Sequence, residues 1–414
     1  MTIATDIHTD LVTPLGAYLR LRARGPASFL LESVERGRLG RHSLVGCGSR
    51  VVSFEEAERE LAARRPVVGY LGYDHVAILE PSVPLPAEGA GLPESRFVVA
   101  ETLVRFDHAA STAEVIVGDR DDVAALLEGH VATPNGAAAL PASPTRRFPE
   151  QAAYERSVRA AQSFIRRGDA FQIVLSQRAE RPTEASPLAL YRALRRVNPS
   201  PYLFLLELGS DLALVGSSPE TLVKVTGGRA SLNPIAGTTV AGEGDAERLL
   251  ASEKDRAEHV MLVDLGRNDL SRVCRAGTVE VERFLEPERY SHVTHLVSEV
   301  AGDLAEGRSA FDLLRACFPA GTVSGAPKVR AMQIVSQLEG YRRGPYAGAV
   351  GYALPGGDLD TCIAIRTIVA TPGLARMQAG AGIVADSDPT AEHEECLRKL
   401  AALEAAVHLA EAGG

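Results

Sequence analysis

Hydrophobic residues recur along this chain mostly in short runs broken by glycine and proline, the pattern of β-strands joined by turns. Such runs are SFLLESVE, RHSLVG, RVVSF, VVGYLGY and AEVIVG early in the chain, and FQIVLSQRAE, PYLFLLEL, LALVGSS and TLVKVTGGRASLNPIAG later. A last meander of strands is predicted over AGAVGYALPGGDLDTCIAIRTIVATPGLARMQAGAGIV. Hydrophobic residues spaced by three and four instead predict helices over 148–169, 247–270, 309–318 and 327–341. Because the strands come in groups and do not alternate singly with helices, the pattern favours an α+β fold with antiparallel sheets.

One change of composition divides the chain. Residues 131–146, VATPNGAAALPASPTR, are rich in proline, alanine, glycine and serine and show little periodicity. Such a stretch is typical of a linker or a surface loop. We therefore predict an N-terminal region, residues 1–130, and a larger region, residues 147–414.

Charge and cysteine content exclude several classes of protein. The formal net charge of −9 argues against nucleic acid or an anionic membrane as partner. The start MTIATDIHTD lacks the features of a signal peptide, and no apolar run reaches 18 residues. The five cysteines are scattered without metal-binding spacing, as in reduced cytosolic proteins. We expect a soluble, globular, cytoplasmic protein.

The last tenth of the chain combines a glycine pair with acidic and basic residues. Gly380 and Gly382 predict a turn, and a helix with an acidic start follows. Glu392 and Glu395 are three residues apart and share a helix face with Lys399, four residues further on. Free N–H groups, a divalent cation and an ammonium group would together bind a small polycarboxylate.

A second acidic pair lies in the helix predicted over 247–270. Asp255 and Glu258 are also three residues apart and face one side of that helix. A solvated helix surface explains one such pair, whereas two pairs allow two helices to supply carboxylates to one Mg²⁺. Mg²⁺ needs only a few protein oxygens because waters and substrate complete its shell.

Other candidate residues have both a structural and a chemical interpretation. The loop FPAGTVSGAPK, with Thr322, is either a simple turn or an anion site before a helix. Glu220 in GSSPE either neighbours a helix cap or is a buried acid with a raised pKa. His295 is either a core residue or a base. Arg366 lies in an apolar strand, where a buried cation needs a carboxylate partner, and Tyr346 is a candidate neighbour.

Taken in order, these segments resemble the chorismate-utilising enzymes, and most closely the anthranilate synthase component I family. The resemblance covers roughly residues 28–400 and is densest after residue 165. It implies a two-layer sandwich of antiparallel sheets flanked by helices, with 147–414 as the chorismate-binding catalytic domain. It is carried by LLES, VGYLGYDH, GDAFQIVLSQR, NPSPYLFLL, LVGSSPE, PIAGT, EKDRAEHVMLVDLGRNDLSRV, HVTHLVSEV, FPAGTVSGAPKVRAM, GPYAGAVGY, IAIRT and QAGAGIVADSDP.

The resemblance also implies roles for the candidate residues. Glu258 and Glu395 would be the principal Mg²⁺ ligands, with Asp255 and Glu392 beside them. Glu220 would protonate the departing C4 hydroxyl of chorismate, since hydroxide leaves poorly without a proton. The remaining members of the catalytic set would be His295, associated with loss of pyruvate, Thr322 and Gln172. Substrate would be bound by Gly237, Thr238, Tyr346, Arg366, Gly380, Ala381, Gly382 and Lys399.

Two positions bear on the nucleophile within this family. Isochorismate and salicylate synthases have lysine, which activates water, where Gln172 stands here. Aminodeoxychorismate synthases often have lysine, a covalent nucleophile, in place of Ala236. Both absences indicate that ammonia adds at C2 and that pyruvate loss gives anthranilate. Two alternatives remain open: release of 2-amino-2-deoxyisochorismate in secondary metabolism, and a non-catalytic, tryptophan-binding regulatory subunit.

The resemblance further implies partners. The chain has no glutamine amidotransferase segment, so a separate subunit would deliver ammonia. The family usually has arginines shortly after PIAGT, whereas here TVAGEGDAE follows, which bears on how that subunit would dock. L-Tryptophan would act as a feedback inhibitor, with candidate residues Glu32, Ser33, Pro199 and Tyr202.

Overall fold

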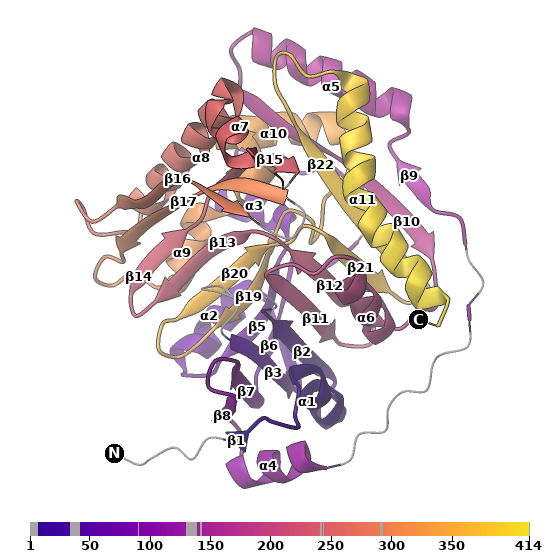
Figure 1. Ribbon diagram of the computed structural model, residues 1–414, viewed down its shortest axis with the longest axis vertical. Helices are drawn as coiled ribbons and strands as arrows, with labels where there is room; N and C mark the ends of the chain where they lie inside the picture. Colours follow the sequence, from indigo (N-terminus) through magenta and orange to yellow (C-terminus); the bar gives the residue numbers. More distant parts are fainter. Residues whose placement is uncertain are drawn as a thin grey trace.

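Two large antiparallel sheets lie face to face, with helices on their outer faces (Figure 1). The computed structural model describes residues 7–33, 42–89, 91–129, 139–140, 143–240, 242, 244–289 and 293–413. The side chains of Thr238, Val240, Lys254 and Val293 are outside this description. The predicted α+β class and the two-layer sandwich are confirmed.

The first sheet has twelve strands drawn from both ends of the chain. In the centre of this sheet a strand from the early part of the chain pairs with one from the later part, so that Glu32 lies opposite Leu203. In spatial order the strands are β1 (Ile7–His8), β8 (Thr112–Val117), β7 (Thr102–Asp107), β3 (His42–Gly48), β2 (Ala27–Glu32), β11 (Tyr202–Leu208), β12 (Ala213–Ser218), β21 (Thr367–Thr371), β22 (Leu374–Ile383), β10 (Gln172–Pro182) and β18 (Gly325–Ala326), and β9 (Arg146–Phe148) pairs with β10.

The second sheet has ten strands and is also assembled from distant segments. Here Leu71 lies opposite Ala349. In spatial order the strands are β15 (Ile235–Val240), β17 (Val293–Asp303), β14 (Arg229–Leu232), β13 (Thr221–Thr226), β20 (Leu359–Ile363), β19 (Ala349–Ala353), β5 (Val67–Leu71), β6 (Ser95–Val99) and β4 (Arg50–Val52), and β16 (Glu280–Arg289) pairs with β17.

Both sheets therefore contain strands from before and after the predicted linker. The two predicted regions, residues 1–130 and 147–414, are consecutive along the chain, but each contributes strands to both sheets. Of the predicted linker, residues 131–138 and 141–142 lie outside the described residues.

The helices predicted over 148–169, 309–318 and 327–341 are present as α5, α9 and α10, but the one over 247–270 is two helices. The helix is interrupted at Ser252, whose backbone is extended. The Ser252 hydroxyl accepts a hydrogen bond from the Asp255 N–H at 3.3 Å and so caps the second helix. The helices are α1 (Pro14–Leu21), α2 (Phe54–Ala62), α3 (Val76–Leu79), α4 (Arg120–Glu128), α5 (Gln151–Arg166), α6 (Pro187–Val197), α7 (Asp245–Ala251), α8 (Glu253–Ser271), α9 (Ala310–Cys317), α10 (Lys328–Glu339) and α11 (Pro389–Glu411), with short 3₁₀ turns η1 (Arg22–Arg24), η2 (Tyr73–His75) and η3 (Gly321–Val323).

Three apolar layers hold these elements together. Between the sheets, side chains of both pack against each other, among them Phe29, Tyr70, Phe204 and Val350. Helices α1, α6 and α11 cover the outer face of the first sheet, while α2, α8 and α9 pack on the second. In the described part of the chain, no helix is both long and apolar enough to span a membrane.

Truncating a ring in the outer layer of the second sheet should destabilise the protein. Phe311 is 1% exposed and packs with its ring centroid 5.0 Å from that of Phe54. We expect Phe311→Ala to lower the free energy of unfolding by about 3–5 kcal/mol, because it leaves a cavity. Phe284→Ala is the control: that ring is 51% exposed, so we expect a change within about 0.5 kcal/mol. Urea unfolding of both variants measures the difference, and equal losses would contradict this packing.

Candidate active site

The predicted glycine turn is wrong: Gly380 and Gly382 lie within strand β22. Ser176 faces Gly380 across β10 and β22, yet the Ser176 N–H donates to the Glu339 carboxylate at 2.8 Å. The Ser176–Gly380 pair is therefore of the non-hydrogen-bonded type, since the two types alternate along an antiparallel pair. The N–H groups of Gly380 and Gly382 consequently point away from β10.

In the described part of the chain, no strand pairs with these two glycines on the edge toward which their N–H groups point. The pairing of β21 with β22 reaches only from Thr371–Leu374 to Ile368–Met377. Just before β21, Arg366 has a positive φ of 51°, a conformation that turns the chain away from β22. The glycine edge, defined here as the backbone groups of Gly380 and Gly382 that point to the β21 side, is thus unpaired by any described strand and available to a ligand.

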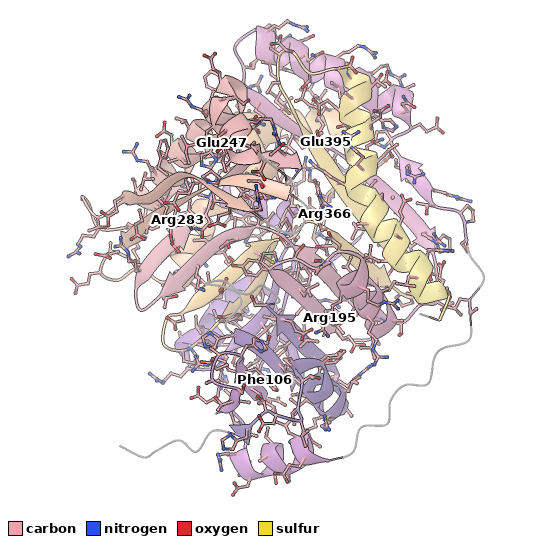
Figure 2. All side chains as sticks on the ribbon, in the orientation of Figure 1. Phe106, Arg195, Glu247, Arg283, Arg366 and Glu395 are labelled. Carbon is pink, nitrogen blue, oxygen red and sulfur yellow. The ribbon has the colours of Figure 1, made fainter. Side chains whose placement is uncertain are left out.

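Lys399 of α11 reaches this edge. Its ammonium group donates to the Gly380 carbonyl at 2.8 Å and pairs with Glu395 at 2.6 Å. The predicted alignment of Glu395 and Lys399 on one helix face is confirmed by this contact. Figure 2 shows Glu395 on α11 and Arg366 nearer the middle of the molecule.

Glu258 of α8 approaches the same strand from another side. The Gln172 amide donates to Glu258 at 3.0 Å. A Cβ atom on Gly382 would lie 2.6 Å from that amide nitrogen, so only glycine allows Gln172 to pass there. Gln172 thus lies between Glu258 and Gly382, and Lys399 lies between Glu395 and Gly380. The two carboxylates come from different helices but approach the same strand.

Asp255 lies against β15 instead. Gly237 has a φ of +70° at a bulge in β15, and a Cβ atom there would be 3.2 Å from the Asp255 Cβ. The bulge therefore lets β15 approach α8 closely. The backbone of Thr238 pairs with His295, while the side chain of Thr238 lies outside the described residues.

The acidic residues fit Mg²⁺ in ligand type. Among the described residues, no group of three or more His, Cys, Asp or Glu side chains is close enough to hold a metal by itself. The available donors are the carboxylates of Glu258 and Glu395, with Asp255 and Glu392 one turn earlier on the same helices. Mg²⁺ accepts such a small oxygen set because it retains waters and takes substrate oxygens.

Glu220 is a half-buried carboxyl group beside the η3 loop. The Thr322 hydroxyl donates to it at 3.0 Å. Burial raises the pKa of Glu220 from 4.5 to about 7, and the Thr322 hydrogen bond and the positive charge of Lys399 lower it by less. At neutral pH this group is therefore protonated in part, as a general acid requires.

Among the described residues, Arg366 has no carboxylate partner of the kind that the sequence predicted. It lies between β20 and β21 rather than in a strand, and no hydrogen bond or ion pair within the described residues engages its guanidinium group. Desolvation lowers the pKa of Arg366, and the nearby Tyr346 raises it by less. A half-buried cation without a protein anion is suited to binding an anionic ligand.

Tyr346 and His295 lie beside two of the glycines of the candidate site. A Cβ atom on Gly380 would be 2.8 Å from the Tyr346 hydroxyl, so this ring faces the glycine. His295 of β17 lies 3.3 Å from the Gly237 carbonyl through its Nδ1, and burial lowers the pKa of the imidazole. Ala381 differs from its neighbours, because its side chain packs in the core with Tyr154 of α5. Its backbone N–H and C=O pair with Leu175 of β10, because the two pair types alternate, so Ala381 presents no polar group at the glycine edge.

Comparison with known proteins agrees with this geometry. Residues 5–405 match the family described as chorismate binding enzyme. The chain belongs to this family. It is 45% identical to anthranilate synthase component 1 of Thermus thermophilus, covering 98% of this chain and 97% of that protein, and 45% identical to that of Streptomyces coelicolor, covering 97% and 88%. The crystal structure of anthranilate synthase component I from Streptococcus pneumoniae superimposes with a TM-score of 0.80 at 34% identity, covering 96% and 98%.

The residues predicted for tryptophan in this chorismate-binding enzyme are divided between two faces of the first sheet. Glu32 shares the face of Leu203 and contacts Tyr191, which donates to its carboxylate. The Tyr202 hydroxyl points the other way, to Thr221 at 2.7 Å and Asp360 at 3.1 Å.

Ser33 and Pro199 lie near the start of β11. The Ser33 hydroxyl donates to the Pro201 carbonyl at 3.1 Å, and Pro199 lies in the same connection between α6 and β11. The end of β2 and the start of β11 are therefore adjacent. Within the described residues, the side chains of Glu32 and Tyr202 do not converge.

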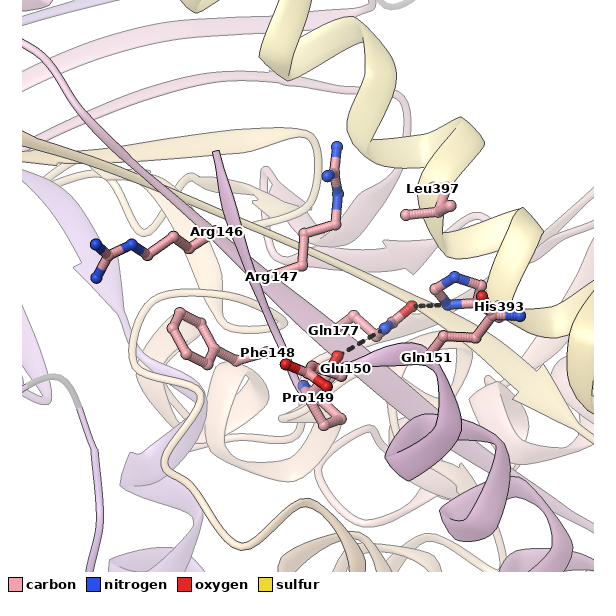
Figure 3. Close-up of a pocket in the computed structure, with 9 residues that line it drawn as sticks. All are labelled: Arg146, Arg147, Phe148, Pro149, Glu150, Gln151, Gln177, His393 and Leu397. Carbon is pink, nitrogen blue, oxygen red and sulfur yellow. Dashed lines mark hydrogen bonds between the residues drawn. The ribbon is translucent and has the colours of Figure 1, made fainter. Parts of the chain in front are cut away.

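A surface groove of about 480 Å³ lies apart from the residues of the candidate active site (Figure 3). It is lined by Arg146–Gln151, Gln177, His393 and Leu397. Gln177 joins its walls, since it lies 2.8 Å from His393 and donates to the Pro149 carbonyl at 3.1 Å. Its neighbour Ser176 faces Gly380 across the sheet, so Gln177 points to the opposite face. The groove is not the candidate active site.

Sequence reasoning missed an ion pair behind the site. Glu339 and Arg343 form a salt bridge of 2.7 Å with both side chains almost fully buried. Their spacing of four residues was the available signal, but it also describes ordinary pairs on exposed helices. The Gly340 residue that ends α10 between them has a positive φ of 69°, so the pair spans a helix terminus.

The raised pKa of Glu220 should make stability depend on pH. Because its pKa is higher in the folded than in the unfolded state, the stability it contributes is complete below about pH 4.5 and is lost as the pH rises through about 7. Without ligand, unfolding in urea should show wild type losing roughly 3 kcal/mol from this group between pH 4.5 and 8. Glu220→Gln should remove that part of the pH dependence.

Thr322→Val provides the comparison. It keeps the Glu220 carboxyl but removes the hydrogen bond that lowers its pKa, so the stability loss should extend to higher pH. A Glu220→Gln variant with the same pH dependence as wild type would show that the carboxyl does not titrate in this range.

Proposed function

We propose that this chain catalyses the Mg²⁺-dependent amination of chorismate at C2 with ammonia, followed by elimination of pyruvate to give anthranilate. The observation that carries the choice of nucleophile is the contact between Gln172 and Glu258. An amide has no basic nitrogen that could deprotonate water, whereas neutral ammonia needs no such activation. The high identity to anthranilate synthase component 1 proteins over nearly the whole chain supports the proposal.

The substrate's carboxylates have suitable partners at the glycine edge. Chorismate carries two carboxylates, and the chain's net charge of −9 repels such a dianion, so local positive groups must bind it. No described residue engages the guanidinium group of Arg366, Lys399 is fixed at the Gly380 carbonyl, and the N–H groups of Gly380 and Gly382 point from the strand edge. The Tyr346 hydroxyl faces the same glycine and supplies a further donor.

The metal would be held by Glu258 and Glu395, with Asp255 and Glu392 close by. When bound, Mg²⁺ neutralises the ring carboxylate of the substrate and orients it. The Gln172 amide and the Lys399 ammonium hold the two principal carboxylates in place from the protein side. No further chain residue is needed, because Mg²⁺ keeps several waters.

Glu220 would supply the proton for the leaving group at C4. Its pKa of about 7 keeps part of it protonated at neutral pH, and Thr322 orients the carboxyl group. The C4 hydroxyl then leaves as water while ammonia bonds to C2. His295, held near the Gly237 carbonyl and kept neutral by burial, is suited to the proton transfer that accompanies loss of pyruvate.

A separate glutamine amidotransferase subunit would provide the ammonia. The relatives are named component 1, a name that implies a second component. L-Tryptophan would inhibit at the junction of β2 and β11, where Ser33 contacts the connection that contains Pro199, with Glu32 on one face of the sheet and Tyr202 on the other. Tryptophan that protects the chain against thermal unfolding in wild type but not in Ser33→Ala would support this assignment.

A product assay tests the function directly. The purified chain is incubated with chorismate, Mg²⁺ and ammonium at alkaline pH, and products are followed by fluorescence and mass spectrometry. Fluorescent anthranilate with pyruvate is the expected result. An amino adduct that keeps its enolpyruvyl group would indicate 2-amino-2-deoxyisochorismate synthase activity instead. No turnover would favour a regulatory subunit.

Removing either principal carboxylate should abolish turnover without unfolding the chain. We expect Glu258→Gln and Glu395→Gln to lower kcat/KM by more than the roughly 10–100-fold that outer-shell partners cost. Glu394→Gln is the matched control, because Glu394 is exposed on the same helix and pairs only loosely with Arg398 at 3.8 Å. Unchanged turnover in both ligand variants would refute the metal assignment.

Replacing the amide at position 172 should introduce water chemistry. A lysine in Gln172→Lys would occupy the place of an amide that cannot act as a base, and its neutral amine would accept a proton from water that attacks C2. We expect isochorismate among the products, detected by mass spectrometry. The surface variant Gln151→Lys should form none. Absence of isochorismate from Gln172→Lys would count against the argument on the nucleophile.

A further inference from the structure

Strand β10 has a gap in its pairing on the side away from β22. On that side β18 pairs with residues 172–173, and β9 pairs with residues 178–180. Between them, no described strand bonds Val174–Gln177. Backbone groups buried there need other partners, because an unpaired N–H or C=O in the interior is costly.

Side chains from the last residue of α10 and the segment that follows it fill this gap. Glu339 accepts the Ser176 N–H at 2.8 Å and the Ser176 hydroxyl at 2.7 Å. The Tyr341 hydroxyl donates to the Ser176 carbonyl at 3.0 Å. Arg343 donates to the Val174 carbonyl at 2.7 Å. Three side chains thus take the place of the missing strand along the edge of β10 that faces away from Gly380 and Gly382 of β22.

Arg343 also holds the loop that carries Thr322. One guanidinium nitrogen donates to the Val323 carbonyl at 2.7 Å, while the other nitrogens bind Glu339 at 2.7 and 2.9 Å. Val323 follows Thr322, whose hydroxyl donates to Glu220. A single planar group therefore links the backbone behind the glycine edge to the loop beside the proton donor.

The same guanidinium group lies against the tyrosine of the site. Its carbon is 5.6 Å from the Tyr346 ring centroid and 4.6 Å from that of Tyr73. The backbone is fixed as well, because the Asp74 carboxylate accepts the N–H groups of Arg343 and Gly344 at 3.1 and 2.9 Å. Arg343 therefore contacts three parts of the site: β10, the Thr322 loop and Tyr346.

Stability alone does not explain this arrangement. The side chains of Arg343 and Glu339 are 1% and 3% exposed, and a buried ion pair often contributes no more than apolar residues of similar size. What apolar residues do not supply is two donors aimed at two carbonyls from different segments. The pair is therefore better explained by geometry than by stability.

We propose that Arg343, held by Glu339, is a positioning residue that sets the Thr322 loop and the glycine edge at the distance that catalysis needs. The inference rests on the proposed function in that catalysis is its readout. Arg343 acts through Thr322, the backbone of β10 and Tyr346. It does not itself reach the substrate.

Arg343→Lys tests the proposal, because lysine keeps the charge but not the fork of donors. We expect kcat for anthranilate formation to fall about 10–100-fold, the effect of a small misplacement, with KM for chorismate within threefold of wild type. Arg181→Lys is the control: Arg181 forms a comparably buried pair with Glu411, far along β10 and α11. It should lower the melting temperature but leave kcat unchanged. Unchanged kcat in Arg343→Lys would overturn the proposal.

A double-variant cycle locates the effect. If Arg343 acts through the loop, Arg343→Lys should cost much less in the Thr322→Val background than in wild type. Fully additive losses would overturn this route. Should Arg343→Lys not fold, Glu339→Gln takes its place, with the same expected loss of kcat and the same overturning result.

Hydrogen exchange separates this proposal from the proposed function. Without any substrate, amides of residues 171–178 and 319–327 should exchange faster in Arg343→Lys than in Arg181→Lys. Equal exchange in the two variants would overturn the positioning role. A wild-type chain that makes no product from chorismate would refute the function, while the exchange result would still decide whether Arg343 positions these segments.

Discussion

The pairing of β10 with β22 is the interaction on which the rest of the site depends. It runs without interruption from Ile173–Ile383 to Pro182–Leu374. Its register decides that Ser176 faces Gly380 and Val174 faces Gly382, and hence that the glycine N–H groups point to the open edge. A shift by one residue would turn these groups toward β10 and place Ala381 where glycine is needed.

Around this pair of strands, the site contains ionisable groups whose burial costs free energy. Glu220 is buried enough to raise its pKa to about 7, and Arg366 is half-buried without a carboxylate among the described residues. Each is poorly solvated, which disfavours its charged form. Such conflicts with stability are expected at functional sites, and the surrounding frame of two packed sheets is extensive enough to maintain them.

The interleaving of early and late strands explains why the chain forms one sandwich. β2 lies beside β11, and β5 lies beside β19, so neither the first 130 residues nor the remainder completes a sheet alone. Tyr73 and Asp74, from the early region, also contact Arg343 behind the site. The early region is therefore part of the frame that supports the catalytic groups.

The sequence by itself determined the fold class, most strands and helices and the i, i+4 contact of Glu395 with Lys399, because these follow from local periodicity and spacing. For Glu220 it left two interpretations open, and the tertiary structure decided for the buried acid. For Gly380 and Gly382 the sequence allowed a turn as well as the end of the late strand meander, since a glycine pair has the same local pattern in both, and the tertiary structure decided for the strand. The same holds for Arg366, whose expected carboxylate is missing among the described residues, and for Glu339 and Arg343, whose partners lie more than 160 residues away in Val174 and Ser176. Such contacts depend on register and crossing of distant segments, which no local pattern records.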